Sequence, residues 1–468
     1  MTTWTVDQLL EATQGTLVSR NRLTSVKGIT LDSRRLQPHE AFLAIRGVRF
    51  DAHTFIPEAI QRGASCLIVS QPPEPSPPVP TIVVADTVKA LGAIAASHRR
   101  RFHIPVVAVT GSCGKTTTKE LITKLLSQDR RVLKTEGTEN NHIGLPLTLL
   151  RLSSDHDVVI VELGSNHPGE IAYLAEITRP TVAVLTNVGP THLEFFGSLE
   201  AVRREKLSLL DALEPSGTAV VPGDQLEVLL EAKSRLRPGM SLITFGTSGQ
   251  CGVQALEVRR AGDAWSIRLR DVLGECSLPL CGSHNVENAL AALACAKAIG
   301  VRLDAVQHRL ADVSPLPMRS QLMRCNGFTL LNDCYNANPL SFARALEVLR
   351  DLEVTRRVVI AGDMLELGPS APAAHQAIGR LAVQCGVDLL VAVGERADDV
   401  AKGASGSDQT HIVTYRTVHE LLPQLHSLIE HGDGILIKGS RGLRLEQVTT
   451  HLLDHAQGGH ECGGDGHA

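Results

Sequence analysis

A short glycine loop that carries a lysine and two threonines has the residue types of a phosphate-binding site. The apolar run Val106–Val109 leads into Thr110-Gly-Ser-Cys-Gly-Lys-Thr-Thr117, and an amphipathic segment follows. This pattern predicts a strand, a tight turn at Gly111 and Gly114, and a helix from about Lys115 whose N-terminal amides and dipole face an anion. In such loops the lysine reaches the β- and γ-phosphates, and the next hydroxyl binds Mg²⁺. The spacing G-x-x-G-K-T is two residues shorter than the usual G-x-x-x-x-G-K-[ST] loop, which narrows the families that fit.

A carboxylate and an imidazole follow two other predicted strands. Glu162 ends the run Val158–Val161, and His192 follows the run Val182–Thr186 after a Gly-Pro turn. Ligands of open parallel sheets bind beyond the carboxyl ends of the strands, so these side chains and the Thr116 hydroxyl are expected to converge on Mg²⁺. Taken alone, His192 is typical of a hydrogen-bonded loop histidine, but its place beside a phosphate loop favours a ligand.

Two further segments can be interpreted either as purely structural or as functional. The amphipathic stretch 197–210, with a serine cap, predicts a helix on which Lys206 is typical of a solvated surface lysine. Gly282-Ser-His284-Asn285-Val-Glu-Asn288 opens an alanine-rich helix after a glycine turn. Its amide side chains could read a base edge, although capping of the helix is the simpler interpretation.

The elements that position these residues fall into three α/β domains, as expected for 468 residues. We predict a small N-terminal α/β domain at 1–85, a central doubly wound P-loop sheet at 86–315, and a C-terminal Rossmann-like domain at 316–468. Alternating β-branched runs and helical patterns support the parallel sheets. The proline-rich stretch 71–80 predicts a loop or linker, and 250–281 predicts an antiparallel insertion.

Composition and charge exclude several other classes of protein. A net charge of −4 and 3% aromatic residues argue against nucleic acid as an obligatory partner. Arg99-Arg100-Arg101 is basic, but it ends the predicted helix 89–97, where cations complement the helix dipole. His460, Cys462 and His467 in the glycine-rich tail are typical of a frayed terminus with incidental ligands.

Cysteine spacing and hydropathy are typical of a cytoplasmic protein. The ten cysteines include no C-x-x-C pair, the N-terminal segment lacks the features of a secretory leader, and no window approaches the roughly 20 apolar residues of a membrane helix. We therefore expect a cytoplasmic monomer without a membrane span.

Several strings, found in order through all three predicted domains, resemble the Mur ligase family of ATP-dependent enzymes that build the peptide of bacterial cell-wall precursors. They are Thr110-Gly-Ser-Cys-Gly-Lys-Thr-Thr, Asn140-Asn-His-Ile-Gly-Leu-Pro, Val161-Glu-Leu-Gly-Ser-Asn-His, Gly282-Ser-His-Asn-Val-Glu-Asn-Ala and Lys438-Gly-Ser-Arg441. Within the family, Asn332-Asp-Cys-Tyr-Asn-Ala-Asn-Pro339, Ala361-Gly-Asp-Met-Leu-Glu-Leu-Gly368, His375 and Asp32-Ser-Arg34 are similar to the ligase that joins D-alanyl-D-alanine to UDP-N-acetylmuramoyl-tripeptide.

The resemblance implies ligation through an acyl phosphate, with ATP and two Mg²⁺ ions. It implies a catalytic set of Lys115, Thr116, Glu162, His192 and Lys206, of which the last four would hold the metal ions, with Lys206 carbamoylated. It implies nucleotide contacts from Gly111, Ser112, Cys113, Gly114, Lys115, Thr116, Thr117, His284, Asn285, Asn288, Arg319 and Asp333. It implies substrate contacts from Ser33, Arg34, Asn140, Asn141, His167, Asn336, Asn338, Ser440 and Arg441. Cys113 and Cys334 occupy positions that vary within the family and place thiols near the nucleotide.

Two alternative functions fit these residues less well. The family member that adds the third peptide residue would carry an Asp-Asn-Pro-Arg-like string, whereas Asn336-Ala-Asn-Pro339 stands here. A P-loop NTPase that drives a partner would show the longer loop and a strand-ending Asp, whereas this chain has Glu162. The third residue of the acceptor peptide, meso-diaminopimelate or lysine, is left open.

Overall fold

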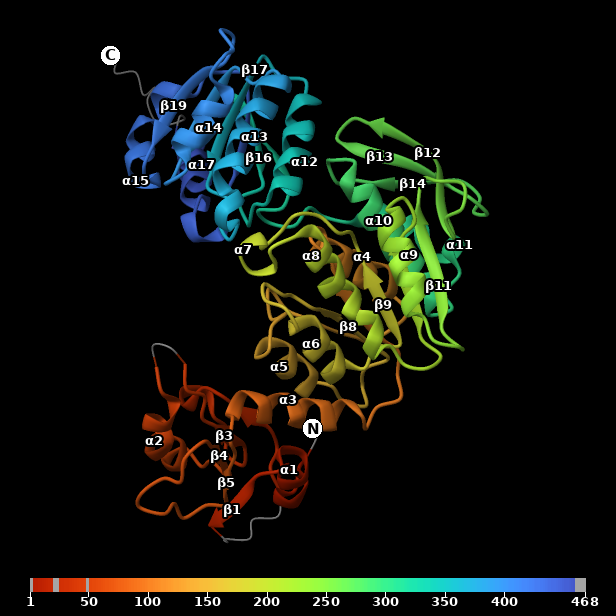
Figure 1. Cartoon of the computed structure of the whole chain (residues 1–468), viewed down its shortest axis with the longest axis vertical. Helices are drawn as coiled ribbons and strands as arrows, with labels where there is room; N and C mark the ends of the chain where they lie inside the picture. The colour runs from red at the N-terminus through yellow and green to blue at the C-terminus, as the bar shows by residue number, and fades with distance from the viewer. Residues whose placement is uncertain (1–2, 20–24, 48–49, 459–468) are drawn as a thin grey trace, which may run out of the picture.

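Three mixed or parallel sheets, each with its own helices, follow one another along the chain (Figure 1). The computed structural model describes residues 3–19, 25–47 and 50–458. The sheets lie within residues 16–83, 106–278 and 321–438. This arrangement confirms the predicted α/β fold with three units. His460, Cys462 and His467 lie outside the described residues.

The central sheet has nine strands in the order β14-β13-β12-β11-β10-β9-β6-β8-β7. Its strands are β6 Val106–Thr110, β7 Val132–Lys134, β8 Val158–Glu162, β9 Val182–Leu185, β10 Thr218–Pro222, β11 Ser241–Gly246, β12 Val253–Ala261, β13 Ala264–Leu269 and β14 Glu275–Leu278. Its helices are α4 Lys115–Leu126, α5 Gly144–Leu150, α6 Glu170–Thr178, α7 Leu193–Phe196, α8 Leu199–Leu207, α9 Leu226–Arg235, α10 His284–Ala298 and α11 Leu303–Val306.

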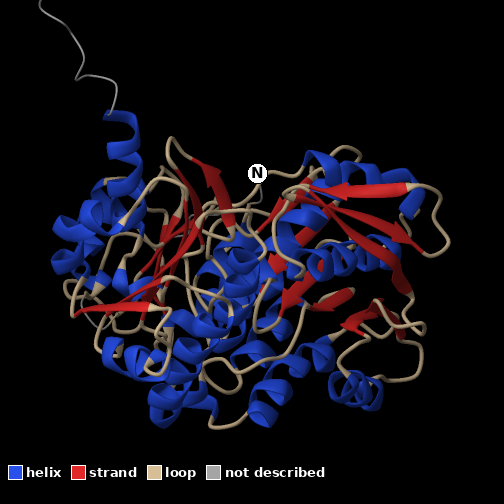
Figure 2. Ribbon diagram, turned by 90° about the horizontal axis from the view of Figure 1, so that it is seen from above, coloured by secondary structure: helices blue, strands red, loops and turns tan. Residues whose placement is uncertain are grey.

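Strands β6, β8 and β9 in the middle of this sheet are buried on both faces, which explains why they are apolar at nearly every position rather than at alternate ones. Val107 and Val109 pack in the core formed with α4 and α10, whereas Val106 and Ala108 pack in the core formed with α5, α6, α8 and α9. Figure 2 shows helices on both sides of the strands. The prediction of a doubly wound sheet is therefore confirmed.

The register of the middle strands brings their carboxyl ends to one edge. In the parallel pairing, Val109 of β6 lies opposite Glu162 of β8, and Thr110 lies opposite Leu185 of β9. The phosphate loop leaves β6 at this edge, so the acidic strand end and the loop after β9 lie beside it.

The predicted antiparallel insertion is confirmed as the β12–β13–β14 meander. The sequence did not show that β12 also pairs with β11 in parallel, through Phe245 and Val253. The meander therefore extends the central sheet instead of forming a separate one.

The N-terminal unit is a five-stranded sheet with the order β1-β5-β4-β3-β2, in which only β1 is antiparallel to its neighbour. Its elements are α1 Val6–Thr13, β1 Thr16–Ser19, β2 Ile29–Thr30, η1 Ser33–Arg35, β3 Ala41–Leu43, η2 Ala52–Phe55, α2 Ile56–Gln61, β4 Cys66–Val69 and β5 Thr81–Val83. The proline-rich stretch 71–80 joins β4 to β5, so it is a loop inside this sheet and does not link two sheets.

The C-terminal unit is a six-stranded sheet with the order β15-β16-β20-β17-β18-β19, parallel except for β15. Its strands are β15 Gln321–Arg324, β16 Phe328–Asn332, β17 Arg356–Gly362, β18 Leu389–Val393, β19 His411–Tyr415 and β20 Asp433–Lys438. Its helices are α12 Pro339–Arg350, α13 Ala371–Gln384, α14 Ala397–Ala404, α15 Val418–Leu421, α16 Leu425–Leu428 and α17 Glu446–Gly458. Within the described part of the chain, no helix of the three units combines the length and apolarity needed to cross a bilayer.

Helix α3, Thr87–Arg99, lies between the N-terminal and central units (Figure 1). We expected Arg99 to complement the dipole of its own helix. Instead its guanidinium is buried and donates to the carbonyl oxygens of Thr178 and Arg179, at the end of α6, and of Phe102. These hydrogen bonds fix α3 against the end of α6 and so tie the two units together.

Replacing Arg99 should destabilise this contact. Arg99→Ala leaves buried carbonyl oxygens without donors and is expected to lower the free energy of unfolding by about 2–3 kcal/mol. Arg100→Ala is the matched control, because Arg100 is exposed one residue later, and should change it by less than about 0.5 kcal/mol. Calorimetric unfolding of the three proteins measures the difference. Equal transitions in both variants would show that the buried guanidinium does not stabilise the α3–α6 contact.

Candidate active site

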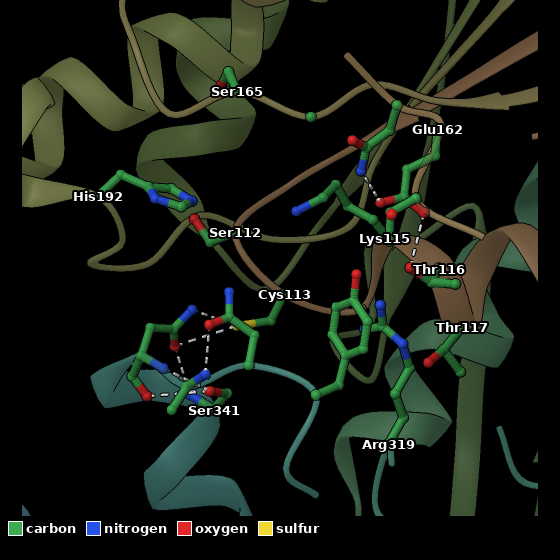
Figure 3. Close-up of a pocket in the computed structure, with 18 of the residues that line it drawn as sticks. Ser112, Cys113, Lys115, Thr116, Thr117, Glu162, Ser165, His192, Arg319 and Ser341 are labelled. Atoms are coloured by element: carbon green, nitrogen blue, oxygen red, sulfur yellow. Dashed lines mark hydrogen bonds between the residues drawn. The ribbon is translucent and has the colours of Figure 1, made fainter. Parts of the chain in front are cut away.

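A cavity of about 500 Å³ lies between the phosphate loop of the central unit and the loops of the C-terminal unit. Among the residues that line it are most of those predicted from the sequence (Figure 3). They are Ser112, Cys113, Gly114, Lys115, Thr116, Thr117, Asn140, Asn141, Glu162, His192, His284, Asn285, Asn288, Arg319, Asp333, Asn336 and Asn338.

The loop after β6 requires glycine at two positions. Gly111 has φ +148°, and a Cβ there would lie 2.0 Å from Oγ1 of Thr186. Gly114 has φ +80°, and its Cβ would lie 2.2 Å from Oδ1 of Asn288. Gly114 also caps α4 without a side-chain hydrogen bond, so the amides of the first turn remain available to an anion.

Asn187, directly after β9, holds the loop in this shape. Its side-chain oxygen accepts from the Cys113 amide at 3.0 Å, and its backbone oxygen accepts from the Ser112 amide at 3.0 Å. In the sequence Asn187 follows the apolar run Val182–Thr186, and nothing near it in the chain indicates that it braces the phosphate loop.

A hydrogen-bonded chain runs from the loop to the neighbouring strand. The Thr116 hydroxyl donates to one Glu162 oxygen at 2.8 Å, and the Asn140 amide donates to the other at 2.8 Å. Lys115 Nζ donates to the Gly111 carbonyl at 2.9 Å, so its charge lies at the mouth of the loop. Oxygen donors beside a phosphate cradle fit Mg²⁺.

Lys206 is not the surface lysine that its helical spacing indicates. It is 1% exposed, and its Nζ donates to the Ser165 hydroxyl at 2.7 Å. The helical pattern misled because it cannot show that the Lys206 face of α8 packs toward the loop after β8. Adjacent Glu205 forms no ion pair with Lys206, because its carboxylate accepts the Gly169 and Ile171 amides at the start of α6, and its charge only partly offsets the burial of Lys206.

The absence of a carboxylate partner sets Lys206 apart from two other fully buried lysines. Lys119 pairs with Glu120 at 2.8 Å and Lys438 pairs with Asp333 at 2.5 Å, whereas no ion pair of the described residues includes Lys206. Burial, reinforced by the charge of Lys115, lowers the pKa of Lys206 to about 7. A buried ammonium without a counter-ion is unfavourable, so the neutral amine is accessible near neutral pH.

His192 lines the cavity and also forms a hydrogen bond. Its Nδ1 contacts the carboxylate of Glu366 in the C-terminal unit, and its ring is turned toward the cavity (Figure 3). The loop-histidine and ligand interpretations are thus compatible, because each uses a different ring nitrogen.

The C-terminal wall depends on a lysine that sequence reasoning did not include among the site residues. Lys438, at the end of β20, donates to the Asp333 carboxylate and to the Asn336 carbonyl at 3.0 Å. The guanidinium of Arg319 lies 3.9 Å from the centre of the Tyr335 ring. A lysine that ends an apolar parallel strand was the available signal for Lys438.

The two asparagines on α10 connect elements and do not cap their helix. Asn288 accepts from the Thr118 hydroxyl at 3.3 Å and donates to Asn285 at 3.0 Å, and Asn285 donates to the Cys281 carbonyl at 2.7 Å. Capping is therefore wrong as the main interpretation. Burial, with the charge of Arg344, lowers the pKa of His284 to about 4, so its ring is neutral at pH 7.

Several predicted contacts are not among the cavity-lining residues. Ser33 donates to Glu58 at 3.0 Å and Arg34 bonds Asp32 at 2.9 Å, both within the N-terminal unit. The other such residues are Gly111, His167, Lys206, Ser440 and Arg441. Ser440 is buried and accepts the Leu365 amide, while Arg441 is exposed and pairs with Glu446.

The cavity also includes residues that were not predicted as site residues, and apart from Lys438 neither spacing nor a strand end marked them. These are Thr138, His142, Gly164, Ser165, Asn166, Glu170, Tyr173, Leu174, Ser320, Tyr335, Ala337, Ser341, Arg344 and Lys438.

The described residues contain no group of three or more His, Cys, Asp or Glu side chains spaced to hold a metal ion. A Mg²⁺ ion at Thr116 and Glu162 would therefore need oxygens from bound phosphate and from water, which is how Mg²⁺ is usually held beside nucleotides.

Family models match all three units of the chain. The Mur ligase family catalytic domain matches residues 25–99, the Mur ligase middle domain 109–296, and the Mur ligase glutamate ligase domain 318–441. The chain is 35% identical over 458 residues to UDP-N-acetylmuramoyl-tripeptide--D-alanyl-D-alanine ligase of Escherichia coli (strain K12), covering 96% of this chain and 98% of the relative. The chain belongs to the Mur ligase family.

Solved Mur ligases share the fold over nearly the whole chain. A crystal structure of MurF from Acinetobacter baumannii has a TM-score of 0.89 at 34% identity and covers 97% of this chain and 99% of its own. MurF ligase from Thermotoga maritima in complex with ADP has a TM-score of 0.83 at 27% identity, covering 92% and 98%. The same ligase of Bacillus subtilis (strain 168) is 31% identical over 96% of this chain and 98% of the relative.

Of the two thiols expected near the nucleotide, only Cys113 lines the cavity. Its Sγ lies 3.3 Å from Nδ2 of Asn338, at the start of α12. Cys334 is 1% exposed, and burial raises its pKa to about 11. Cys113 is therefore the more reactive of the two.

Alkylating Cys113 should block nucleotide binding, because the added group occupies the loop that receives phosphate. We expect N-ethylmaleimide to weaken ADP binding at least tenfold, or about 1.4 kcal/mol, measured by titration calorimetry. Cys113→Ala should bind ADP and resist the reagent, and bound ADP should slow labelling of the unmodified chain. Equal loss of binding in the treated Cys113→Ala protein would place the sensitive thiol elsewhere.

Proposed function

We propose that this Mur ligase joins D-alanyl-D-alanine to UDP-N-acetylmuramoyl-tripeptide, with ATP converted to ADP and phosphate, in the synthesis of the cell-wall precursor. The observation that carries the proposal is the near-complete coverage of relatives with this named activity, together with a cavity that joins a phosphate loop to a second polar wall. The predicted cytoplasmic location and monomeric state remain predictions.

The proposed chemistry has two steps. A carboxylate oxygen of the tripeptide attacks the γ-phosphorus of ATP, which gives an acyl phosphate and ADP. The neutral amine of D-alanyl-D-alanine then attacks the acyl carbon, the C–O bond to phosphate breaks, and the amine proton leaves with inorganic phosphate. Anionic reactants must meet in the first step, so neutralising charge and fixing geometry are the main requirements.

The residues around the loop meet these requirements. The α4 amides and Lys115 would bind the β- and γ-phosphates, and Thr116 with Glu162 would hold one Mg²⁺. Mg²⁺ supplies charge neutralisation for the transferring phosphoryl group. Asn140 orients Glu162 through its 2.8 Å hydrogen bond.

Other predicted site residues would bind the rest of the nucleotide and the two substrates. His284, Asn285, Asn288, Arg319 and Asp333 would contact the nucleotide. Asn141 and His167 would lie along the muramoyl-peptide path, and Ser33 and Arg34 near the uridine. Asn336, Asn338, Ser440 and Arg441 would serve the dipeptide.

A second Mg²⁺ would lie between His192 and Lys206. An ammonium repels Mg²⁺, so Lys206 would first react with CO₂ to form a carbamate, whose anionic oxygen is a ligand. The burial of Lys206 without a carboxylate partner and its lowered pKa support this modification, because only the neutral amine reacts.

The activity is tested by a product assay that contains ATP, D-alanyl-D-alanine and one of two UDP-tripeptides, ending in meso-diaminopimelate or lysine. We expect ADP release and UDP-pentapeptide formation to require both the UDP-tripeptide and the dipeptide, and the preferred tripeptide to identify the third residue. ATP consumption that is equal without either substrate would refute the ligase function and favour an NTPase.

The role of Lys206 predicts a dependence on CO₂. Lys206→Ala should lower kcat about 10²–10³-fold through loss of a charge-stabilising ligand. The unmodified enzyme should lose activity in CO₂-free buffer and regain it with bicarbonate. Recovery should be faster above pH 7, where a pKa of about 7 leaves most Lys206 unprotonated, than below it.

A spectroscopic control separates the carbamate from general damage. Carbon-13 bicarbonate should give a carbamate resonance in the unmodified protein that Lys206→Ala lacks. Lys119, equally buried but paired with Glu120, should contribute none. Full activity of Lys206→Ala, or an unchanged resonance in it, would refute the role of Lys206.

A further inference from the structure

A loop of the C-terminal unit reaches the imidazole of His192 across the boundary between two units. Glu366 Oε2 contacts His192 Nδ1, and Asn166 of the central unit also hydrogen-bonds the Glu366 carboxylate. A carboxylate oxygen accepts hydrogen bonds, so this contact is a hydrogen bond when His192 Nδ1 carries the proton. The other ring nitrogen, Nε2, then turns its lone pair to the cavity that His192 lines.

We propose that Glu366 is a positioning residue, which fixes the tautomer and orientation of His192 when the C-terminal unit docks on the central unit. This inference rests on the proposed function, in which His192 Nε2 serves the reaction. Carboxylates that accept the second N–H of a functional histidine fix its ring in many sites. Here the carboxylate belongs to another unit. The tautomer and orientation of the His192 ring are therefore fixed only when the C-terminal unit is docked on the central unit.

The backbones of both partners are held in unusual conformations at this contact. His192 has φ +50° and Glu366 has φ +61°, a region that side-chain-bearing residues rarely adopt. The Glu194 amide donates to the Glu366 carbonyl at 3.1 Å. A Cβ on Gly368 would lie 3.0 Å from the Glu194 Cα, so the loop rests closely on α7. Strain of this kind persists where the surroundings fix the conformation.

The residues before Glu366 are anchored to the C-terminal unit itself. The Met364 amide donates to His375 Nε2 at 2.9 Å, and the Leu365 amide donates to the Ser440 hydroxyl at 2.9 Å. His375 is fixed in turn by a 2.7 Å hydrogen bond from Nδ1 to a backbone carbonyl of α13. His375 and Ser440 therefore hold the loop that presents Glu366.

Substitutions of Glu366 distinguish the carboxylate from the backbone. Glu366→Gly keeps the positive φ without strain and removes the carboxylate, so it should lower kcat about 10–100-fold. Its KM for ATP should change by less than about twofold, because the phosphate loop is untouched. Glu366→Gln keeps an acceptor oxygen at the same reach, so it should rescue most of kcat.

The matched control removes another ion pair between the same two units. Asp263 pairs with Arg324 at 2.8 Å, and neither residue lines the cavity. Asp263→Asn should retain the kcat of the unmodified enzyme. A similar loss in Asp263→Asn and Glu366→Gly would mean that general weakening of the interface explains the effect, which would overturn the proposal.

Nitrogen-15 spectra of histidine-labelled, metal-free protein provide a readout besides activity. The His192 signals, assigned by their absence in His192→Ala, should show a protonated Nδ1 and an unprotonated Nε2, and Glu366→Gly should lose this distinction. A proton on Nε2 in the unmodified chain, or unaltered kcat in Glu366→Gly, would overturn the proposal. If no pentapeptide forms at all, the proposed function fails, whereas the spectra still decide whether Glu366 fixes the ring.

Discussion

The register between β6, β8 and β9 is the constraint on which the site depends. Val109 lies opposite Glu162, and Thr110 lies opposite Leu185. A slip of one residue would move every side chain of a strand to the other face. A slip would exchange the side chains of two separately close-packed cores, one on each face, so the packing of both cores opposes it. The 2.8 Å contact between Thr116 and Glu162 is therefore a consequence of packing far from the loop.

The three buried lysines differ in whether they have a carboxylate partner, and this difference separates structural from chemical roles. Lys119 and Lys438 are buried with carboxylate partners, and these ion pairs hold elements together. Lys206 is buried beside a hydroxyl, and its neighbour Glu205 is committed to the amides of α6. Leaving a buried cation unpaired destabilises its charged form. Of the three lysines, only Lys206 is buried without a carboxylate partner, and it is the lysine proposed to hold the second Mg²⁺.

The sequence predicted the parts of this structure that local pattern and strand ends determine. Apolar β-branched runs located β6, β8 and β9, and Gly111 with Gly114 marked the turn. Prediction from the sequence failed where the main contact of a side chain is with a residue far away in the chain. The spacing of α8 could not reveal that Lys206 packs against Ser165, 41 residues earlier in the chain. Nothing near His192 in the chain pointed to Glu366, 174 residues later. Asn285 and Asn288 have the residue type and position of helix caps, and nothing near them in the chain points to the Thr118 hydroxyl on α4, which donates a hydrogen bond to Asn288.

The site is assembled from two units, and several polar contacts cross their shared boundary. Cys113 meets Asn338, His192 meets Glu366, and Glu287 of α10 pairs with Arg344 of α12 at 2.7 Å. Boundaries of this kind between units of one chain permit relative motion more readily than large apolar ones. A ligand that contacts the phosphate loop and the Asp333 wall together therefore stabilises the docked arrangement by its differential affinity for it. Glu366, the partner of His192, belongs to the C-terminal unit. Ligand binding at the nucleotide site and fixing of the His192 ring by Glu366 therefore depend on the same equilibrium, the docking of the C-terminal unit on the central unit.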